Sequence, residues 1–124
     1  DGTERGRLRG IPMLKHEITD EAGVVVLKVL EENLDALTVP EARPLVDQLV
    51  ERGGIKVVFD MSAVKTIDSS GVAIIVALFK RLRALGGAVR VVGVTGQPQE
   101  IFHFLRLDSA LPIFATTADA LQKF

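Results

Sequence analysis

The residues whose types and spacing could do chemistry stand together in the segment Asp68-Ser69-Ser70-Gly71. Asp is among the residues preferred just before a helix, because its side-chain oxygen accepts a hydrogen bond from a free N–H group of the first turn. The positive end of the helix dipole favours negative charge at the same place. A hydroxyl of this segment can therefore carry a phosphate without disrupting the helix. The same four residues can also be a capping sequence and nothing more.

Other combinations of reactive residues are missing from the sequence. It contains no cysteine, which excludes disulfides, thiolate metal sites and cysteine nucleophiles. It has no zinc-binding His-Glu-x-x-His motif, no phosphate-binding lysine loop and no Gly-x-Ser-x-Gly elbow. His16 and His103 are expected to be surface or core histidines, because a metal site needs several convergent groups. Asp60 and Asp68 could pair, but Asp60 lacks the acidic cluster with which a phosphoaspartate site holds its metal, so we expect no catalytic residue, metal or cofactor.

Length, composition and charge narrow the class of protein. A chain of 124 residues with 48% hydrophobic residues is long enough for one domain with a substantial core. Its formal net charge of −1 provides no general attraction to nucleic acid or anionic lipid. The longest apolar run, Val72–Phe79, is far shorter than the roughly 20 residues that span a bilayer. Since no cleavable signal pattern opens the chain, the sequence predicts a cytoplasmic protein without a membrane span.

The elements around the Asp68 segment predict an α/β domain. A buried strand at Ile55–Phe59 precedes the segment, and a helix from Ser69 to about Leu85 follows it. Repeated alternation of strands and helices is typical of parallel strand pairs. The other predicted elements are, in chain order, a hairpin of strands at Met13–Thr19 and Val24–Leu30, a helix between Thr38 and Gly53, a strand at Ala88–Val94, a helix at Gln97–Arg106, a short strand at Ile113–Ala115 and a final helix capped by Thr116 or Thr117. Residues 1–10 are expected to form a flexible tail before a single domain over residues 11–124.

Hydrophobic periodicity assigns core faces to the predicted helices. Thr38 and Glu41 have the spacing of a capping box at the start of the first helix. In the helix after Ser69, the predicted core positions are Val72, Ile75, Val76, Phe79 and Leu82. Ile74 and Leu78 fall on an adjoining face, so the first half of this helix is either buried on two sides or partly exposed as a docking surface. In the helix at Gln97–Arg106, the predicted core residues are Ile101, Phe102, Phe104 and Leu105.

Three segments together resemble the STAS domain: Val57–Val64, Ile67–Val72 and Arg81–Gly87. A strand that ends in Asp-Met-Ser, then Asp-Ser-Ser-Gly at the start of a helix, then Gly-Gly before a valine-rich strand, is an uncommon ordered set. The resemblance covers the chain from about Leu14 to Phe124. It implies an α/β domain with a mixed, mostly parallel sheet of four or five strands, an N-terminal hairpin and about four helices.

The resemblance also implies a function, since the best-known soluble members of this family are bacterial anti-sigma factor antagonists. Ser69 matches their phosphoacceptor serine. Unphosphorylated, such a protein binds an anti-sigma factor that is also a serine kinase, and so releases the sigma factor. Phosphorylation by that kinase ends the complex, and a serine phosphatase restores the first state.

The same resemblance suggests which residues bind the partner. The expected partner-binding residues are Asp68, Ser70, Gly71, Ile74 and Leu78. Asp68 would orient the loop, and Gly71 would leave room for the partner. Ile74 and Leu78 would be exposed contacts.

Two positions depart from the pattern of the family. Glu32-Asn33-Leu34 stands where a glycine usually comes just before the aspartate matched by Asp35. Leu105-Arg106 stands where Thr-Gly often precedes the pair matched by Leu107-Asp108. Arg106 can alter the partner surface, so the identity of the kinase stays open. Two other roles also stay open: a subunit of a larger STAS assembly that acts as a stress-signalling scaffold, and a soluble STAS partner of a membrane transporter or lipid-transport complex.

Overall fold

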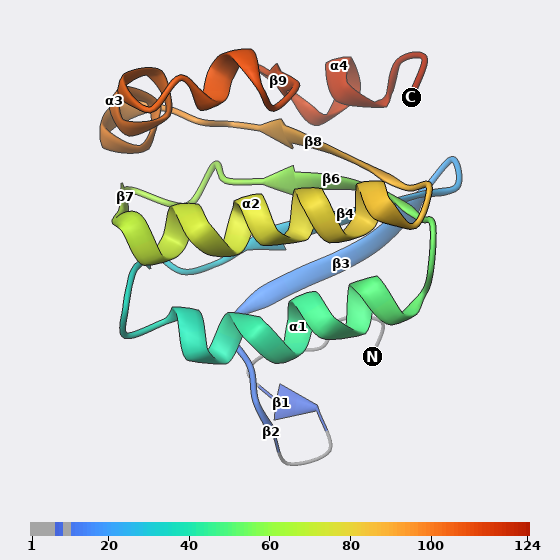
Figure 1. Ribbon diagram of the computed structural model, residues 1–124, viewed down its shortest axis with the longest axis horizontal. Helices are drawn as coiled ribbons and strands as arrows, with labels where there is room; N and C mark the ends of the chain where they lie inside the picture. Colours follow the sequence, from blue (N-terminus) through green and yellow to red (C-terminus); the bar gives the residue numbers. More distant parts are fainter. Residues whose placement is uncertain (1–6, 9–10) are drawn as a thin grey trace.

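A computed structural model describes residues 7–8 and 11–124, with side chains from residue 13 onward. Its centre is a five-stranded sheet in the order β3-β4-β6-β8-β9 (Figure 1). The strands of this sheet are β3 (His16–Glu21), β4 (Val24–Val29), β6 (Lys56–Asp60), β8 (Ala88–Val92) and β9 (Ile113–Phe114). β3 pairs antiparallel with β4, and the other pairs are parallel. The predicted mixed, mostly parallel sheet with an N-terminal hairpin is confirmed.

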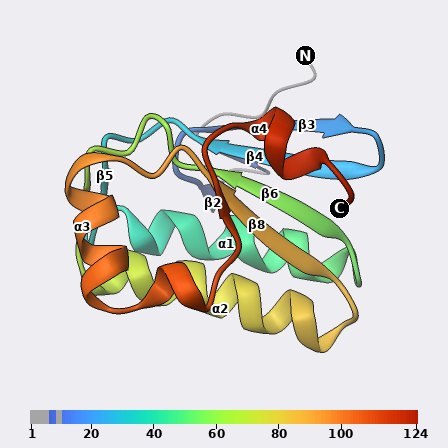
Figure 2. The ribbon, with the colours of Figure 1, turned by 90° about the horizontal axis from the view of Figure 1, so that it is seen from above.

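The described part of the chain contains four α-helices, as predicted. They are α1 (Val39–Glu51), α2 (Ser69–Ala84), α3 (Gly96–Phe104) and α4 (Thr117–Leu121), and a 3-10 helix, Leu107–Ser109, follows α3. α1 and α2 lie side by side on one face of the sheet, and α4 lies on the opposite face (Figure 2). Thr116, one of the two predicted cap residues, accepts a hydrogen bond from the N–H of Asp119 at the start of α4. None of the helices in this part of the chain is long and apolar enough to cross a membrane.

Two further pairs of short strands lie outside the main sheet. β5 (Asn33–Leu34) pairs in parallel with β7 (Thr66–Ile67), in segments for which the sequence predicts only connections. β1 (Arg7–Leu8) pairs antiparallel with β2 (Ile11–Pro12). The predicted flexible tail therefore includes two residues of a strand, and its other positions, 1–6 and 9–10, lie outside the described residues.

The β3–β4 hairpin closes through a two-residue turn. Ala22 and Gly23 form this turn with φ angles of 54° and 80°. Positive φ at both positions defines a type I′ turn, whose twist matches that of the two strands. β4 then lies between β3 and β6, so its apolar residues are buried on both faces of the sheet.

The larger hydrophobic cluster lies between the sheet and the pair of helices α1 and α2. In α2 the buried positions are Gly71, Ile74, Ile75, Leu78 and Leu82. Ile74 and Leu78 are only 7% and 0% exposed, so the expectation that they are exposed partner contacts is wrong. The reason is that α2 packs against α1 as well as against the sheet, which buries two adjoining faces of the helix (Figure 1). Val72, Val76 and Phe79, predicted as core, are half-buried.

The start of α1 differs from the predicted capping box. Thr38 has φ −96° and ψ −27°, a helical conformation in which its side chain makes no cap hydrogen bond. Its hydroxyl instead accepts from the N–H of Asp35 at 2.9 Å and donates to the carbonyl oxygen of Asn33 at 3.0 Å. The capping box with Glu41 is therefore wrong, because the Thr38 side chain serves the preceding turn. The predicted stop is confirmed, since α1 ends before Gly53, whose φ is 84°.

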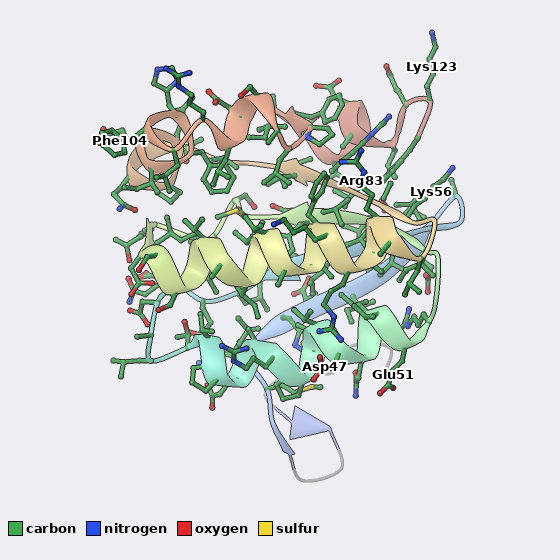
Figure 3. All side chains as sticks on the ribbon, in the orientation of Figure 1. Asp47, Glu51, Lys56, Arg83, Phe104 and Lys123 are labelled. Carbon is green, nitrogen blue, oxygen red and sulfur yellow. The ribbon has the colours of Figure 1, made fainter. Side chains whose placement is uncertain are left out.

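The core face of α3 is narrower than predicted. Phe102 is buried and Ile101 packs partly against the core, whereas Phe104 and Leu105 are 82% and 48% exposed. The prediction that the last two belong to the core is wrong. Residues two apart lie on roughly opposite faces of a helix, so Phe104 points away from the molecule (Figure 3), whereas Phe102 is buried.

The opposite face of the sheet carries a smaller hydrophobic cluster under α4. Its buried members are Val24, Val26, Val58, Val92 and Ala120. The guanidinium of Arg90, on β8, holds the segment that contains α4. Nη1 donates to the carbonyl oxygens of Ala120 and Gln122 at 2.9 and 2.8 Å, and Nη2 donates to that of Lys123 at 3.2 Å. The same guanidinium lies over the ring of Phe124, with Cζ 4.3 Å from the ring centroid.

Replacing Arg90 with Met should lower the free energy of unfolding by about 1 to 3 kcal/mol, because three carbonyl oxygens lose a charged donor. Urea unfolding followed by circular dichroism measures this change. Arg52→Met is the matched control, since Arg52 is exposed and no hydrogen bond or ring contact engages its side chain within the described residues. An equal loss from both variants would contradict the role given to Arg90.

Candidate functional site

The Asp68 segment lies at the edge of the sheet where the parallel strands have their carboxyl ends. β6 ends at Asp60, the chain then forms β7, and α2 begins at Ser69. β5, the partner of β7, comes just before the loop that enters α1. α1 and α2 therefore begin side by side at one edge of the sheet (Figure 1). Ligands of open α/β sheets commonly bind at this edge.

Asp68 is the N-cap of α2, as the sequence predicts. Its backbone is extended, with φ −114° and ψ −173°. Its Oδ1 accepts from the N–H groups of Ser70 at 2.8 Å and Gly71 at 3.1 Å. Its Oδ2 accepts from the N–H of Ala36 at 3.2 Å. One carboxylate thus satisfies two free donors of α2 and links the start of that helix to the loop before α1.

The loop before α1 is itself fixed by a carboxylate. Oδ1 of Asp35 accepts from the N–H of Leu37 at 3.0 Å and from the N–H of Thr38 at 3.3 Å. These bonds form a tight turn that holds the N–H of Ala36 in place for Asp68. Leu37 is 86% exposed at this turn.

Gln97 is a supporting residue that the sequence analysis missed. Its side-chain amide donates to the carbonyl oxygen of Ile67 at 3.0 Å and accepts from the N–H of the same residue at 2.9 Å. This pair of bonds attaches β7, the segment just before Asp68, to the first turn of α3. A glutamine at the start of a predicted helix carries no sequence signal for such a contact, because its partner is a backbone group 30 positions away.

Gly71 allows α2 to pack closely against the neighbouring loop. A Cβ atom at this position would lie 2.2 Å from the carbonyl oxygen of Leu34 and 2.7 Å from Cγ1 of Ile67. Gly71 is buried. The expectation that it leaves room for a partner is therefore wrong, because the space beside it is filled by the chain's own backbone.

Ser69 is exposed on the first turn of α2, and its hydroxyl has no hydrogen-bond partner among the described residues. It opens onto a groove of about 420 Å³ between the starts of α1 and α2. The groove is lined by Ala36, Val39, Pro40, Arg43, Ser69, Ser70, Ala73 and Ile74. Arg43 is the one charged residue in that lining, and Ser70 is half-buried. The serine is thus accessible to another protein while its backbone is held by the capped helix.

The other candidate residues do not join this site. His16 is buried and its Nδ1 lies 2.8 Å from the carbonyl oxygen of Leu14, whereas His103 is exposed and its Nδ1 lies 3.0 Å from Oδ2 of Asp108. Asp60 accepts from a backbone N–H of its own loop at 2.8 Å. Among residues 7–8 and 11–124, no group of three or more His, Asp or Glu side chains is placed to hold a metal ion.

Replacing Asp68 with Ala should lower the free energy of unfolding by about 1 to 2 kcal/mol, because the N-cap of α2 and the link to Ala36 are both lost. Asp68→Asn is the control, since an amide oxygen still accepts from the helix N–H groups. Chemical unfolding of the two variants measures the difference. Equal destabilisation by Ala and Asn would argue against the capping role.

Gly71→Ala should be destabilising by about 2 kcal/mol or more, because the new methyl group meets the backbone of Leu34, which cannot move without shifting β5. Ser70→Ala, one position earlier in the same turn, removes a hydroxyl that has no partner within the described residues and should change stability by less than about 0.5 kcal/mol. Thermal unfolding of both variants tests the contrast. A fully stable Gly71→Ala protein would refute the close approach.

Comparison with known proteins agrees with this fold. The family model described as STAS domain matches residues 15–120. A TM1081 homologue from Thermotoga neapolitana, named as an anti-sigma factor antagonist, is 26% identical over 77 residues, which are 62% of this chain and 68% of that protein. The crystal structure of an anti-sigma factor antagonist from Mycobacterium paratuberculosis superposes with a TM-score of 0.78 at 28% identity, over 86% of this chain and 90% of the other.

A third similar structure is the Bacillus cell fate determinant SpoIIAA in its phosphorylated form. It has a TM-score of 0.66 and 19% identity, over 87% of this chain and 97% of the other. At this identity the likeness concerns the fold. The family model, in contrast, spans most of the sequence, from the first long strand to the last helix. The chain belongs to the STAS domain family.

Proposed function

We propose that this STAS domain is an anti-sigma factor antagonist that is switched off by phosphorylation of Ser69. In the unphosphorylated state it binds an anti-sigma factor with serine kinase activity, so that the sigma factor is released. The kinase then phosphorylates Ser69 and the complex separates. A serine phosphatase returns the protein to its binding state, and all of these steps take place in the cytoplasm.

The observation that carries this proposal is the position of the Ser69 hydroxyl. It is exposed, it has no partner in the described part of the chain, and it stands at the start of a helix whose backbone is fixed by Asp68. A kinase needs an accessible acceptor hydroxyl, and Ser69 offers one. The names of the similar proteins from Thermotoga neapolitana and Mycobacterium paratuberculosis support the same role.

The switch acts through the interface and leaves the fold intact. A phosphate adds about −1.5 to −2 charges and three acceptor oxygens. At a helix N-terminus this charge is tolerated, because the positive end of the helix dipole favours an anion there. Inside a docked interface the same charge must be desolvated, which costs free energy, so the complex weakens.

The contact surface differs from the set of residues expected from the sequence. Gly71, Ile74 and Leu78 are buried, so they support the surface from inside. Ser69 and Ser70 stay as contact residues, and Asp68 fixes their backbone. Leu37, highly exposed in the loop that Asp68 holds, joins them as an apolar contact.

A pull-down from lysate of the native host tests the proposal. Wild type and Ser69→Ala should capture a small ATP-binding kinase, whereas Ser69→Asp should capture much less. Ser109→Asp is the control, because it adds the same charge at an exposed serine of the 3-10 helix after α3. Equal capture by all four proteins would refute control by Ser69. Capture of transporter or scaffold subunits by every variant would replace the antagonist role with a structural one.

A further inference from the structure

We propose that Arg43 is the internal binding partner of the phosphate on Ser69. In the phosphorylated protein, its guanidinium pairs with the phosphate across the groove between α1 and α2. The inference rests on the proposed function, since it concerns the same modified serine. It adds a residue of this chain that recognises the phosphorylated state.

Arg43 and Ser69 line the same groove, from neighbouring helices. Arg43 lies one turn after the start of α1, and Ser69 lies on the first turn of the neighbouring α2. Both line the same groove of about 420 Å³, in which Arg43 is the one charged residue. A guanidinium presents paired N–H donors that match phosphate oxygens, so it can bind a phosphate through two parallel hydrogen bonds.

Arg43 is available for this contact. Its natural partner on the same helix face is Asp47, four residues later. Oδ1 of Asp47, however, accepts from Nη1 of Arg81 on α2 at 2.7 Å (Figure 3). Within the described residues, no ion pair or hydrogen bond engages Arg43. The Asp47–Arg81 pair therefore leaves the Arg43 guanidinium unpaired within the described residues, on the wall of the groove that Ser69 also lines.

A counter-charge favours the phosphate because two aspartates belong to the segments that adjoin Ser69. Asp68 directly precedes Ser69, and Asp35 lies in the loop that Asp68 holds. Their oxygens accept from backbone N–H groups, but their negative charge stays. Lys65, just before β7, does not line the groove and is paired with Glu32 at 3.4 Å. Arg43 is thus the cationic residue of the groove lining that can pair with the phosphate.

Pairing has a consequence for the surface. It draws the phosphate toward the groove, whose remaining walls include the apolar side chains of Val39, Pro40 and Ala73. The ion pair between Arg43 and the phosphate then fills the groove between the two helices. A partner side chain that binds in this groove in the unphosphorylated state is therefore excluded from it in the phosphorylated state.

The experiment uses protein with phosphoserine incorporated at position 69 during translation, so that neither kinase nor partner is needed. The pKa of the phosphoserine is measured by ³¹P NMR titration. A neighbouring guanidinium favours the dianion and lowers this pKa, so Arg43→Gln should raise it by about half a unit. Arg43→Lys keeps the charge and should give a smaller rise, because the paired N–H geometry is lost.

Arg52→Gln is the matched control, since it removes the same charge just after the other end of α1. Its phosphoserine pKa should stay at the wild-type value. Urea unfolding of the unphosphorylated Arg43→Gln protein should equal that of wild type, which separates phosphate binding from an effect on the fold. A pKa rise for Arg43→Gln that is no larger than that for Arg52→Gln would overturn the proposal. Failure of the proposed function would appear differently, as loss of kinase capture while the Arg43-dependent pKa shift persists.

Discussion

The carboxylate of Asp68 accepts backbone hydrogen bonds from two segments that are more than 30 residues apart, the first turn of α2 and the loop before α1. Because all three N–H groups donate to the Asp68 carboxylate, the loop before α1 and the first turn of α2 cannot move apart without breaking one of these hydrogen bonds. Ser69 follows this carboxylate directly, so the backbone that carries its hydroxyl is held from both sides. The hydroxyl itself takes no part in holding the fold, which is why it can be modified without loss of structure.

Close packing gives this edge of the molecule its shape. α2 is buried against the sheet on one face and against α1 on another, and the glycine in its first turn touches the backbone of Leu34. The residues behind Ser69 are therefore core residues, and what remains accessible is a shallow strip of small side chains beside a groove. On the proposed function, a charge added to these exposed side chains leaves the backbone and packing of the domain as they are. It alters the electrostatic complementarity between this surface and a partner.

The order of strands and helices could be predicted from the sequence, because apolar β-branched runs, the Asp68 cap and the glycines after the helices are local signals. The N-cap prediction held for the same reason, since the bonds from Asp68 to Ser70 and Gly71 are made within one turn. The burial of Ile74 and Leu78 could not be predicted, because it depends on where α1 packs. Gln97 and the β5–β7 pair were missed because their partners are distant backbone groups, for which one sequence holds no signal.

The two faces of the sheet are covered very unequally. One carries the large cluster under α1 and α2, and the other carries the small cluster under the five-residue helix α4 (Figure 2). The free energy needed to open a segment follows the contacts that it must break, so we expect the α4 segment to open at a lower free energy than the larger layer. Its amide hydrogens should then exchange with solvent ahead of those of the central strands. Each opening would uncover the valines of β4, β6 and β8, so the anchoring of the last ten residues by Arg90 decides how long this apolar surface stays covered.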